Sequence, residues 1–244
     1  MSESSLVITP QWNSPKHIVA YTSTRQGGVS TGDLDGLNVG AHVGDDLLLV
    51  KANRALLPYH EKLSWLEQVH SNKVVVLPSA DTTADAAYSS SSACFCAVMT
   101  ADCVPILLCD NEGKEVAAVH GGWKGLESGV IANTISQFNA APSSIMAWIG
   151  PAICQRCYEV DQHLAEVFVA YPDALLKSSS TGKFLLDLPA IAKAQLVALG
   201  LTDVVSSNLC TYCEQEQFYS HRLATHRGKR ATGRIVSVIG ITER

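Results

Sequence analysis

Short apolar runs bounded by turn residues dominate the hydrophobic pattern of this chain. Runs of this kind, rich in Val, Ile and aromatic residues, are typical of buried β-strands. Several of them follow one another through short turns, such as residues 111–114. The pattern predicts strands at residues 18–25, 64–70, 73–78, 94–99, 104–109, 115–120, 145–150 and 234–241.

Helical spacing marks other parts of the chain. A helix is predicted where one face carries the apolar residues Leu126, Val130, Ile131, Ile135 and Phe138. Further helices are expected at residues 47–59, from Asp161 as the N-cap through Ala170, and at 188–199 with Gly200 as the stop. Strands and helices mix without a strict βαβ rhythm. The expected fold class is therefore α+β with mixed β-sheets rather than a doubly wound parallel sheet.

The first predicted strand runs into a Gly- and Asp-rich loop of about twenty residues that ends near Asp46. A loop of this length inside a compact domain is usually functional or disordered. Ser-rich patches at residues 89–92 and 178–180 indicate further loops.

Composition narrows the function classes. The chain has 244 residues, 47% hydrophobic and 17% charged, which is enough for a sizeable core. Its net charge of −5 gives no general attraction to nucleic acid or to an anionic membrane. The N-terminal residues show no basic region followed by an apolar one, and no apolar run is long enough to span a membrane. We expect a cytoplasmic protein whose eight Cys are reduced thiols, metal ligands or a nucleophile rather than disulfides.

Three residues at the ends of predicted strands form the candidate site. His70 ends "WLEQVH", Cys103 follows the strand at 94–99, and His120 ends "EVAAVH". Strand ends meet along one rim of a sheet, so the three side chains could converge there. One thiolate and two imidazoles suit Zn²⁺ and leave a fourth tetrahedral position open for water or substrate, as catalytic zinc requires. Cu²⁺ could occupy the same ligand set, because the affinity order favours it over Zn²⁺.

The same residues also allow interpretations without a metal. Cys103 could be a nucleophile, with His120 as its base and Asp102 as the group that orients the base. Adjacent strand residues point to opposite faces, so Asp102 fits that role only if the turn reorients it. The plainest interpretation is that His70 and His120 are partly buried side chains with satisfied hydrogen bonds.

Several residues are candidates for binding a substrate. Arg25, beside the glycines of the long loop, and Arg222 offer guanidinium groups for phosphate, unless they are ordinary surface charges. Lys124 and the backbone of "HGGWKG" form another candidate anion site. Asn38 could bind a hydroxyl or a base, or could only support a turn.

Gln68 lies two residues before His70, on the same face of the predicted strand, so it could orient a ligand or contact substrate. Trp123 could stack on a purine, although a Trp in this position is more often a packing residue. Two Cys-x-x-Cys pairs, Cys154/Cys157 and Cys210/Cys213, resemble halves of a zinc site. The 52 residues between the pairs exceed what a compact zinc ribbon allows, so such a site needs the fold to bring them together.

A series of motifs gives the chain a resemblance to the YfiH-like family over nearly its whole length. That family has been called laccase-domain or polyphenol oxidase, peptidoglycan editing factor, and purine nucleoside phosphorylase. The motifs are specific only when taken together. In order they are "STRQGGVS", "LNVGAHVGDD", "WLEQVH", "MTADCVPILL", "AAVHGGWKG", "GPAI", "YEV", "CTY", "FYSHR" and "TGR".

The resemblance implies one catalytic domain over residues 1–244, with two mixed sheets packed between helices in α/β/β/α layers, as in a group of cysteine-hydrolase-like toxins. It implies zinc ligands at His70, Cys103 and His120. The implied reaction is phosphorolysis of adenosine, inosine and methylthioadenosine to the free base and a ribose 1-phosphate, with adenosine deamination as a second activity. We expect small-molecule substrates, no nucleic acid or membrane partner, and a monomer.

The chain departs from the family pattern in three places. "HGGWKG" stands where the family usually has "HAGWRG", and Cys154 stands where Gly often follows "GPAI". "SHRL" replaces "SYRR", so one guanidinium, that of Arg222, remains of two.

The competing family names are not equally compatible with these residues. A multicopper oxidase needs a trinuclear cluster besides a His₂Cys site, whereas this chain has eight His in total and no His-x-His pair. The His-x-Glu and Pro-Cys-x-x-Cys pattern of zinc nucleobase deaminases is also absent. The leading hypothesis is the phosphorylase. The alternative is an amide hydrolase that edits UDP-muramoyl peptide precursors, and copper-dependent oxidation of polyphenols is less favoured.

Overall fold

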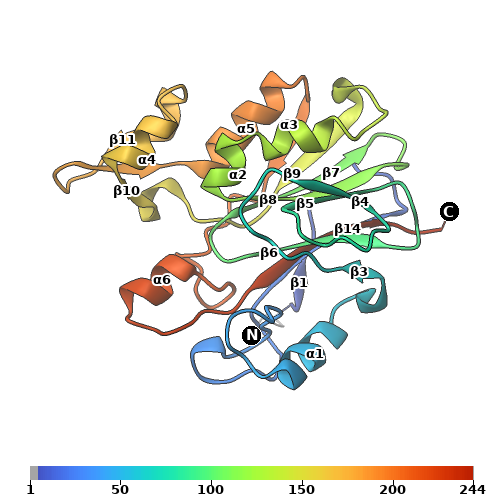
Figure 1. The fold of residues 1–244 in the computed structure, drawn as a ribbon, viewed down its shortest axis with the longest axis horizontal. Helices are drawn as coiled ribbons and strands as arrows, with labels where there is room; N and C mark the ends of the chain where they lie inside the picture. The colour runs from blue at the N-terminus through green and yellow to red at the C-terminus, as the bar shows by residue number, and fades with distance from the viewer. Residues whose placement is uncertain (1–4, 244) are drawn as a thin grey trace.

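Two mixed β-sheets packed face to face form the centre of the molecule (Figure 1). The structure, a computed structural model, describes residues 5–243. A five-stranded sheet has the order β1 (Val7–Ile8), β2 (Ile18–Ser23), β14 (Ile235–Ile241), β6 (Phe95–Thr100) and β3 (Leu63–Ser64). A six-stranded sheet has the order β13 (Asp203–Ser206), β9 (Ile145–Ile149), β7 (Val104–Asp110), β8 (Val116–Gly121), β5 (Ala86–Ser89) and β4 (Val74–Leu77).

Alternation of side chains along β7 explains the layers, because successive strand residues face opposite sides of a sheet. Ile106 and Leu108 pack in a cluster with residues of the helices. Leu107 and Cys109 pack in a second cluster, between the two sheets, that includes Val98 of β6 and Ile239 of β14. Every residue of β7 is buried, and the strand is apolar from Val104 to Cys109, because both of its faces belong to the core.

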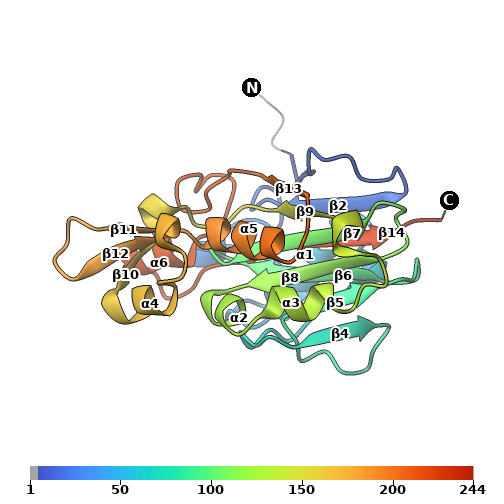
Figure 2. The same ribbon diagram turned by 90° about the horizontal axis from the view of Figure 1, so that it is seen from above.

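Helices cover the outer faces of both sheets (Figures 1 and 2). The helices α2 (Trp123–Glu127), α3 (Val130–Ile135) and α5 (Leu188–Ala198) lie over the six-stranded sheet. The helix α1 (Leu47–Ala55) lies on the side of the five-stranded sheet. The α+β class and the α/β/β/α layering expected from the sequence are confirmed.

A smaller antiparallel sheet extends from one end of the molecule (Figure 2). It has the order β10 (Glu159–Asp161), β12 (Lys183–Leu186) and β11 (Leu175–Lys177). The helix α4 (Gln162–Val167) packs on it, and α6 (His221–His226) lies near the same end. No helix within residues 5–243 combines the length and apolar character needed to cross a membrane.

Helix ends follow the capping residues in the sequence. The side chains of Asp46, Asp161, Asp187 and Ser220 accept hydrogen bonds from backbone N–H groups in the first turns of α1, α4, α5 and α6. Gly200, at φ 98°, follows α5 as expected.

Two helices are shorter than predicted, since α1 ends at Ala55 and α4 at Val167. Two further predictions of secondary structure are wrong. The helix expected at 126–138 is two helices, because Gly129 takes a left-handed conformation with φ 88° between them. The strand expected at 64–70 stops after Ser64. Beyond it the chain makes an isolated bridge at Glu67 and turns at His70, whose φ is 60°. The strands β1, β5, β10, β11, β12 and β13 were not predicted. The sequence of β5, AAYS, is short and contains no β-branched residue.

Candidate metal centre and active site

His70, Cys103 and His120 come together, as the sequence predicts, although they belong to three separate segments. Cys103 lies in the turn between β6 and β7, His120 lies on β8, and His70 lies in the loop before β4. One imidazole nitrogen of each His and Sγ of Cys103 lie within 4.8 Å of one another. The rings of His70 and His120 meet edge to face, with centroids 4.8 Å apart. We call this group the His-Cys-His centre.

Asp85, immediately before β5, orients His120. Nδ1 of His120 lies 2.8 Å from Oδ1 of Asp85, and its backbone N–H donates to the Asp85 carbonyl at 2.7 Å. Because the carboxylate can only accept, Nδ1 carries the proton, and Nε2 is left as the atom that can bind a metal. A carboxylate behind a histidine in this way is the usual support of a metal ligand.

The same carboxylate holds the loop that carries His70. Asp85 accepts hydrogen bonds from the backbone N–H groups of His70 at 3.0 Å and Ser71 at 2.6 Å, and from the Ser71 hydroxyl at 2.8 Å. The side chain of Asp85 is fully buried. Burial raises the pKa of Asp85, but the hydrogen bonds from His120 and Ser71 outweigh it and lower the pKa to about 2. Asp85 is therefore ionised at neutral pH and ties two of the three candidate ligands together.

The turn before Cys103 is held by Asp102, which is in a left-handed conformation with φ 92°. For a residue other than glycine this backbone conformation costs about 1–3 kcal/mol, so the surrounding contacts must hold Asp102 in it. The carboxylate accepts from the Thr211 hydroxyl at 2.7 Å and from the Arg222 backbone N–H at 2.6 Å. The Asp102 carbonyl accepts from the backbone of Ile153 at 3.0 Å.

The suggestion that Asp102 orients His120 is therefore wrong. The left-handed turn aims the Asp102 carboxylate at Thr211 and Arg222, and Asp85 orients the imidazole instead. Asp102 positions Cys103 by fixing the turn to two distant segments.

Cys103 and His120 form a charge-coupled pair. Burial raises the pKa of Cys103, but the charge and hydrogen bond of His120 and the hydrogen bond of His70 together lower it to about 6. Burial lowers the pKa of His120, and the Cys103 thiolate and Asp85 reverse that effect and raise it. The thiol is thus poised to be a thiolate, the form that binds metals and attacks electrophiles.

Gly122 leaves room for the centre. A Cβ on this residue would lie 2.9 Å from Cδ2 of His70 and 3.3 Å from Sγ of Cys103. The glycine-rich stretch after His120 therefore gives His70 and Cys103 the space to approach each other. This is a steric reason for its composition, in addition to the anion binding considered from the sequence.

Two cavities meet at the His-Cys-His centre, since His70 and Cys103 line both. The first, of about 260 Å³, is bounded by aromatic and aliphatic side chains together with Asp102 and Lys124; those side chains are Trp123, Ile153, Tyr158 and Leu188. We call it the aromatic cavity.

The second cavity, of about 280 Å³, is lined by more polar groups, which are His42, Gln68, Thr100, His120, His221 and Arg234, together with Met99 and Ala101. We call it the polar cavity. Burial lowers the pKa of His42, and the charges of Arg234 and Arg54 lower it further, so this histidine is neutral at pH 7. Arg234 keeps its charge, since a guanidinium does not lose its proton in proteins.

Two of the four predicted substrate-binding residues lie close to the centre. Gln68 lines the polar cavity, and its amide makes two hydrogen bonds with the backbone of Met99, at 2.8 and 2.7 Å. The Arg222 guanidinium donates to the Glu159 carbonyl and lies 4.9 Å from the ring centroid of Tyr158. It reaches the aromatic cavity through Tyr158 rather than by lining it.

Arg25 and Asn38 line neither cavity. The Arg25 guanidinium donates to the carbonyls of Gln215 and Asp35 and lies 4.8 Å from the ring centroid of Tyr219. Asn38 is fully buried. Its Nδ2 donates to Asp45 and Gly40, and its Oδ1 accepts from the backbone of Gly40 and Arg234. Both side chains order the long loop at 26–46.

Sequence reasoning missed the residues that complete the site. Asp85 lies in "ADAAYSS", which matches no motif, so only the folded structure connects it to the two histidines. Tyr158 and Arg234 belong to the motifs "YEV" and "TGR", but the sequence alone indicates no function for either side chain. His42, Thr100 and His221 come from segments that converge only in three dimensions.

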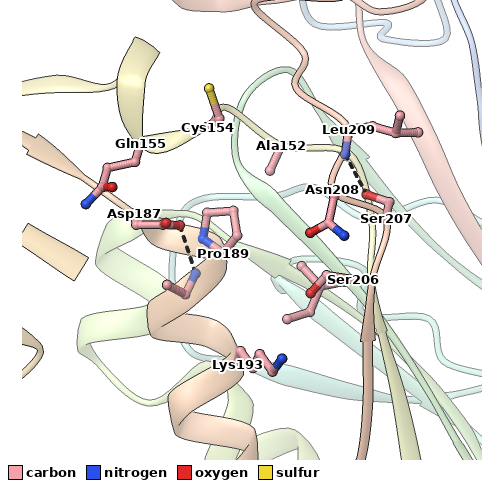
Figure 3. A pocket seen from close by; sticks show the side chains of 13 residues that line it. Ala152, Cys154, Gln155, Asp187, Pro189, Lys193, Ser206, Ser207, Asn208 and Leu209 are labelled. Atoms are coloured by element: carbon pink, nitrogen blue, oxygen red, sulfur yellow. Dashed lines mark hydrogen bonds between the residues drawn. The ribbon is translucent and has the colours of Figure 1, made fainter. Parts of the chain in front are cut away.

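A larger cavity, of about 400 Å³, lies apart from the His-Cys-His centre, between the start of α5 and the segment after β13 (Figure 3). Asp187, Lys193, Ser206 and Asn208 line it, and Cys154 stands at its rim. The Asp187 carboxylate already caps the backbone of Ala190 at 2.9 Å. Its size alone assigns it no function.

The fold and the His-Cys-His centre define a protein of the laccase-domain, YfiH-like class. Residues 19–242 match the family described as multi-copper polyphenol oxidoreductase laccase, and the chain belongs to that family. The resemblance stated from the sequence motifs is thereby confirmed.

Similar proteins are found in several bacteria. The chain is 43% identical to "Purine nucleoside phosphorylase YfiH" of Shigella flexneri, over 96% of this chain and 98% of that protein. It is 41% identical to "Purine nucleoside phosphorylase" of Haemophilus influenzae, over 95% and 98% of the two chains.

Solved structures share the fold. A Neisseria meningitidis protein, NMB0706, is 37% identical and matches with a TM-score of 0.90, over 98% of this chain and 100% of that one. YlmD of Geobacillus stearothermophilus is 30% identical and matches with a TM-score of 0.89, over 100% and 98% of the two chains.

Proposed function

We propose that this chain is a zinc-dependent purine nucleoside phosphorylase that acts on adenosine, inosine and methylthioadenosine, with adenosine deamination as a second activity. The observation that carries the proposal is the position of the His-Cys-His centre at the junction of an aromatic and a polar cavity. Relatives named purine nucleoside phosphorylase, which match over nearly the full chain, support the enzyme class.

The donor set fits a metal ion. Two imidazoles and one thiolate are ligands that Zn²⁺ prefers, and three protein ligands leave one position open. Asp85 supplies the supporting carboxylate, and Gly122 the space. When bound, zinc would act as a Lewis acid toward a substrate oxygen or a water molecule.

Cu²⁺ could occupy the same ligand set, but oxidase chemistry of the multicopper type needs further copper sites rich in His. Among residues 5–243, the other metal-competent cluster consists of four cysteines and contains no His. We therefore propose zinc, and not copper, as the working ion.

The aromatic cavity is the proposed place of the purine. Trp123 and Tyr158 offer flat apolar surfaces for stacking on a heterocycle. The Arg222 guanidinium stacks on Tyr158 and holds that ring in place. Lys124 lines the same cavity, where its ammonium can stabilise negative charge on a departing purine.

The polar cavity is the proposed place of phosphate and of the ribose hydroxyls. Arg234 supplies positive charge, and Gln68 and the neutral His42 surround the space with polar groups. The Thr100 hydroxyl is buried and has no hydrogen-bond partner among the described residues. Because an unsatisfied buried hydroxyl costs about 1–3 kcal/mol, a ligand oxygen is its natural partner.

In the proposed reaction a phosphate oxygen attacks C1′ of the ribose as the C1′–N9 bond breaks. The electron pair of that bond leaves with the purine, which takes up a proton, and the sugar becomes ribose 1-phosphate. The role of the side chains is to hold phosphate on one side of the ribose and the base on the other, and to offset charge on both.

Our proposal keeps Gln68 as a residue that contacts substrate and makes Arg222 a positioning residue that acts through Tyr158. It assigns Arg25 and Asn38 to the order of the loop at 26–46, given their contacts with backbone and with Asp45. We further propose a cytoplasmic enzyme that acts as a monomer.

A second candidate function rests on a separate observation. Cys103, His120 and Asp85 have the order of a nucleophile, a base and the carboxylate that orients it. This arrangement suits an amide hydrolase, such as one that removes a wrong first amino acid from UDP-muramoyl peptide precursors. Release of serine from UDP-muramoyl-serine by the purified protein would favour this function over the phosphorylase.

The test of the leading proposal is a product assay on the zinc-loaded protein. With adenosine and phosphate, we expect free purine base (adenine, with hypoxanthine after deamination) and ribose 1-phosphate in equal amounts, and base release should depend on phosphate. Adenosine that stays intact in the presence of metal-loaded, folded protein would overturn the proposal. The Cys103→Ala variant serves as the control for a contaminating enzyme.

A further inference from the structure

A second cluster of metal-competent side chains lies beside the active site. Cys154, Cys157, Cys210 and Cys213 bring their four sulfur atoms within 4.8 Å of one another. Sγ of Cys157 lies 3.6 Å from that of Cys154 and 3.4 Å from that of Cys213. We call this group the four-cysteine cluster.

Pairing of two parallel strands brings the distant halves of the cluster together. The strand β9 pairs with β13 in register from Met146 with Asp203 to Ile149 with Ser206. The pairing continues past the strand ends as a bridge between Ala152 and Cys210. Each strand is therefore followed, a few residues later, by its Cys-x-x-Cys pair on the same edge of the sheet.

The local backbone resembles that of a metal-binding turn. The N–H groups of Cys154 and Cys213 both point at Sγ of Cys210, at 3.3 and 3.4 Å. Hydrogen bonds from the backbone to a sulfur stabilise its thiolate form, which is the form that binds metal. Residues Gln155–Cys157 form a single 3₁₀ turn that presents the second cysteine of the first pair.

The sulfur spacing suits a tetrahedral ion. With a Zn–S bond of about 2.3 Å, the sulfurs of a tetrahedral site lie about 3.8 Å apart. The distances of 3.6 and 3.4 Å are close to that value. They are well above the S–S bond length of about 2.05 Å, and the described cysteines are free thiols.

We propose that the four-cysteine cluster binds one structural Zn²⁺ ion, separate from the ion of the His-Cys-His centre. Four thiolates fill a tetrahedral site and leave no open position, so this ion would stabilise the structure and would not take part in the reaction. The ion would lie near the surface, since Cys213 is exposed, whereas Cys210 is buried.

The cluster has a mechanical connection to the active site. Ile153 and Thr211, each adjacent to a cysteine of the cluster, donate two of the hydrogen bonds that hold Asp102. Tyr158, next to Cys157, is a wall of the aromatic cavity. An ion that fastens the two Cys-x-x-Cys segments would therefore also fix the turn of Cys103 and the ring of Tyr158.

Of the four cysteines, Cys154 lines the large cavity nearby. Figure 3 shows the sulfur of Cys154 pointing away from Asp187 and Lys193, which line that cavity.

The experiment is a measurement of zinc per chain on purified wild-type protein and matched variants. We expect two zinc ions in the wild type, one in Cys213→Ser and in Cys157→Ser, and one in Cys103→Ala. Cys94→Ala is the control, because Cys94 is a free thiol outside both groups, and it should keep two. The double variant Cys103→Ala/Cys213→Ser should hold none.

A second measurement tests the cluster without substituting any of its four cysteines, because such substitutions could prevent folding. On folded Cys103→Ala, titration with an organomercurial reagent should release the one remaining zinc ion as four thiols react. A wild type that holds at most one zinc, all of it lost in Cys103→Ala, would overturn the proposal. The proposal would also be overturned if the intact protein, under non-reducing conditions, had a mass two hydrogens below that of the fully reduced chain and a disulfide mapped to these four cysteines.

Discussion

The Asp85 carboxylate contacts His120 and the loop of His70 at the same time, accepting from Nδ1 of His120 at 2.8 Å and from the backbone of His70 at 3.0 Å. One buried anion thus fixes the tautomer of one proposed ligand and the backbone position of another. The third ligand, Cys103, is fixed from the other side by Asp102. Two aspartates therefore define the geometry of the His-Cys-His centre without joining it.

Replacement of Asp85 by Asn should weaken metal binding while the protein stays folded. The Asn side chain has one acceptor oxygen in place of two, so it cannot accept all of the hydrogen bonds that the Asp85 carboxylate accepts. His120 also loses the negative charge of Asp85, which raises the basicity of its ring. Loss of such a supporting carboxylate costs about 10–100-fold in metal affinity or activity. Competition with a chromophoric chelator measures the change. Asp81→Asn is the control, because Asp81 is exposed and pairs with Lys73, and its metal affinity should match the wild type.

Replacement of Cys103 by Ala should abolish activity and remove the ion of the His-Cys-His centre. Cys103→Ser keeps the size of the side chain but replaces a thiolate with a weakly binding hydroxyl, so it should behave almost like the Ala variant. Elemental analysis and the phosphorolysis assay together give the readout. Full activity in a variant that no longer binds metal at this centre would contradict the proposed zinc dependence.

Replacement of Asp102 by Ala should destabilise the fold and slow the reaction. The variant leaves the Thr211 hydroxyl and the Arg222 N–H without their acceptor, each a loss of about 1–3 kcal/mol when buried. Thr211→Val removes only one of these donors and should lose less stability. Urea denaturation of the two variants measures the difference. Equal stability of Asp102→Ala and the wild type would mean that the left-handed turn does not depend on this carboxylate.

Replacement of Gly122 by Ala should disturb the metal centre more than the fold. The new methyl group would lie 2.9 Å from the His70 ring and 3.3 Å from Sγ of Cys103, so the ring must shift from its present position beside the thiol. We expect weaker metal binding and at least a tenfold loss in kcat/KM, with a melting temperature close to the wild type. Gly182→Ala is the control, since a Cβ there meets nothing within 4 Å and only its left-handed backbone is affected. It should leave metal binding unchanged.

The sequence predicted the long, apolar and periodic elements well, because their own residues determine them. The strands β2, β6, β7, β8, β9 and β14 and the helix α5 lie where the hydrophobic pattern placed them. The prediction of one helix at 126–138 was wrong because Gly129, which has a left-handed conformation, interrupts it although the apolar spacing continues. The strand predicted at 64–70 was wrong because Gln68 binds the backbone of Met99 with its side chain, and the chain turns at His70.

The three residues proposed as ligands could be found from the sequence, but the residues that support them could not. His70, Cys103 and His120 stand at ends of apolar runs and in family motifs, so both kinds of reasoning pointed to them. Asp85 and Arg234 act through contacts with residues far away in the chain, which no local pattern reveals. The two Cys-x-x-Cys pairs showed the same limitation, since their 52-residue separation hid a contact that the parallel pairing of β9 and β13 creates.

The central claim is that one zinc ion, held by His70, Cys103 and His120, serves phosphorolysis of purine nucleosides. X-ray data collected on either side of the zinc absorption edge, from crystals of protein shown to convert adenosine and phosphate, test it most directly. We predict an anomalous peak between the two imidazoles and the Cys103 sulfur. An active protein whose crystals show no peak at that position would contradict the account.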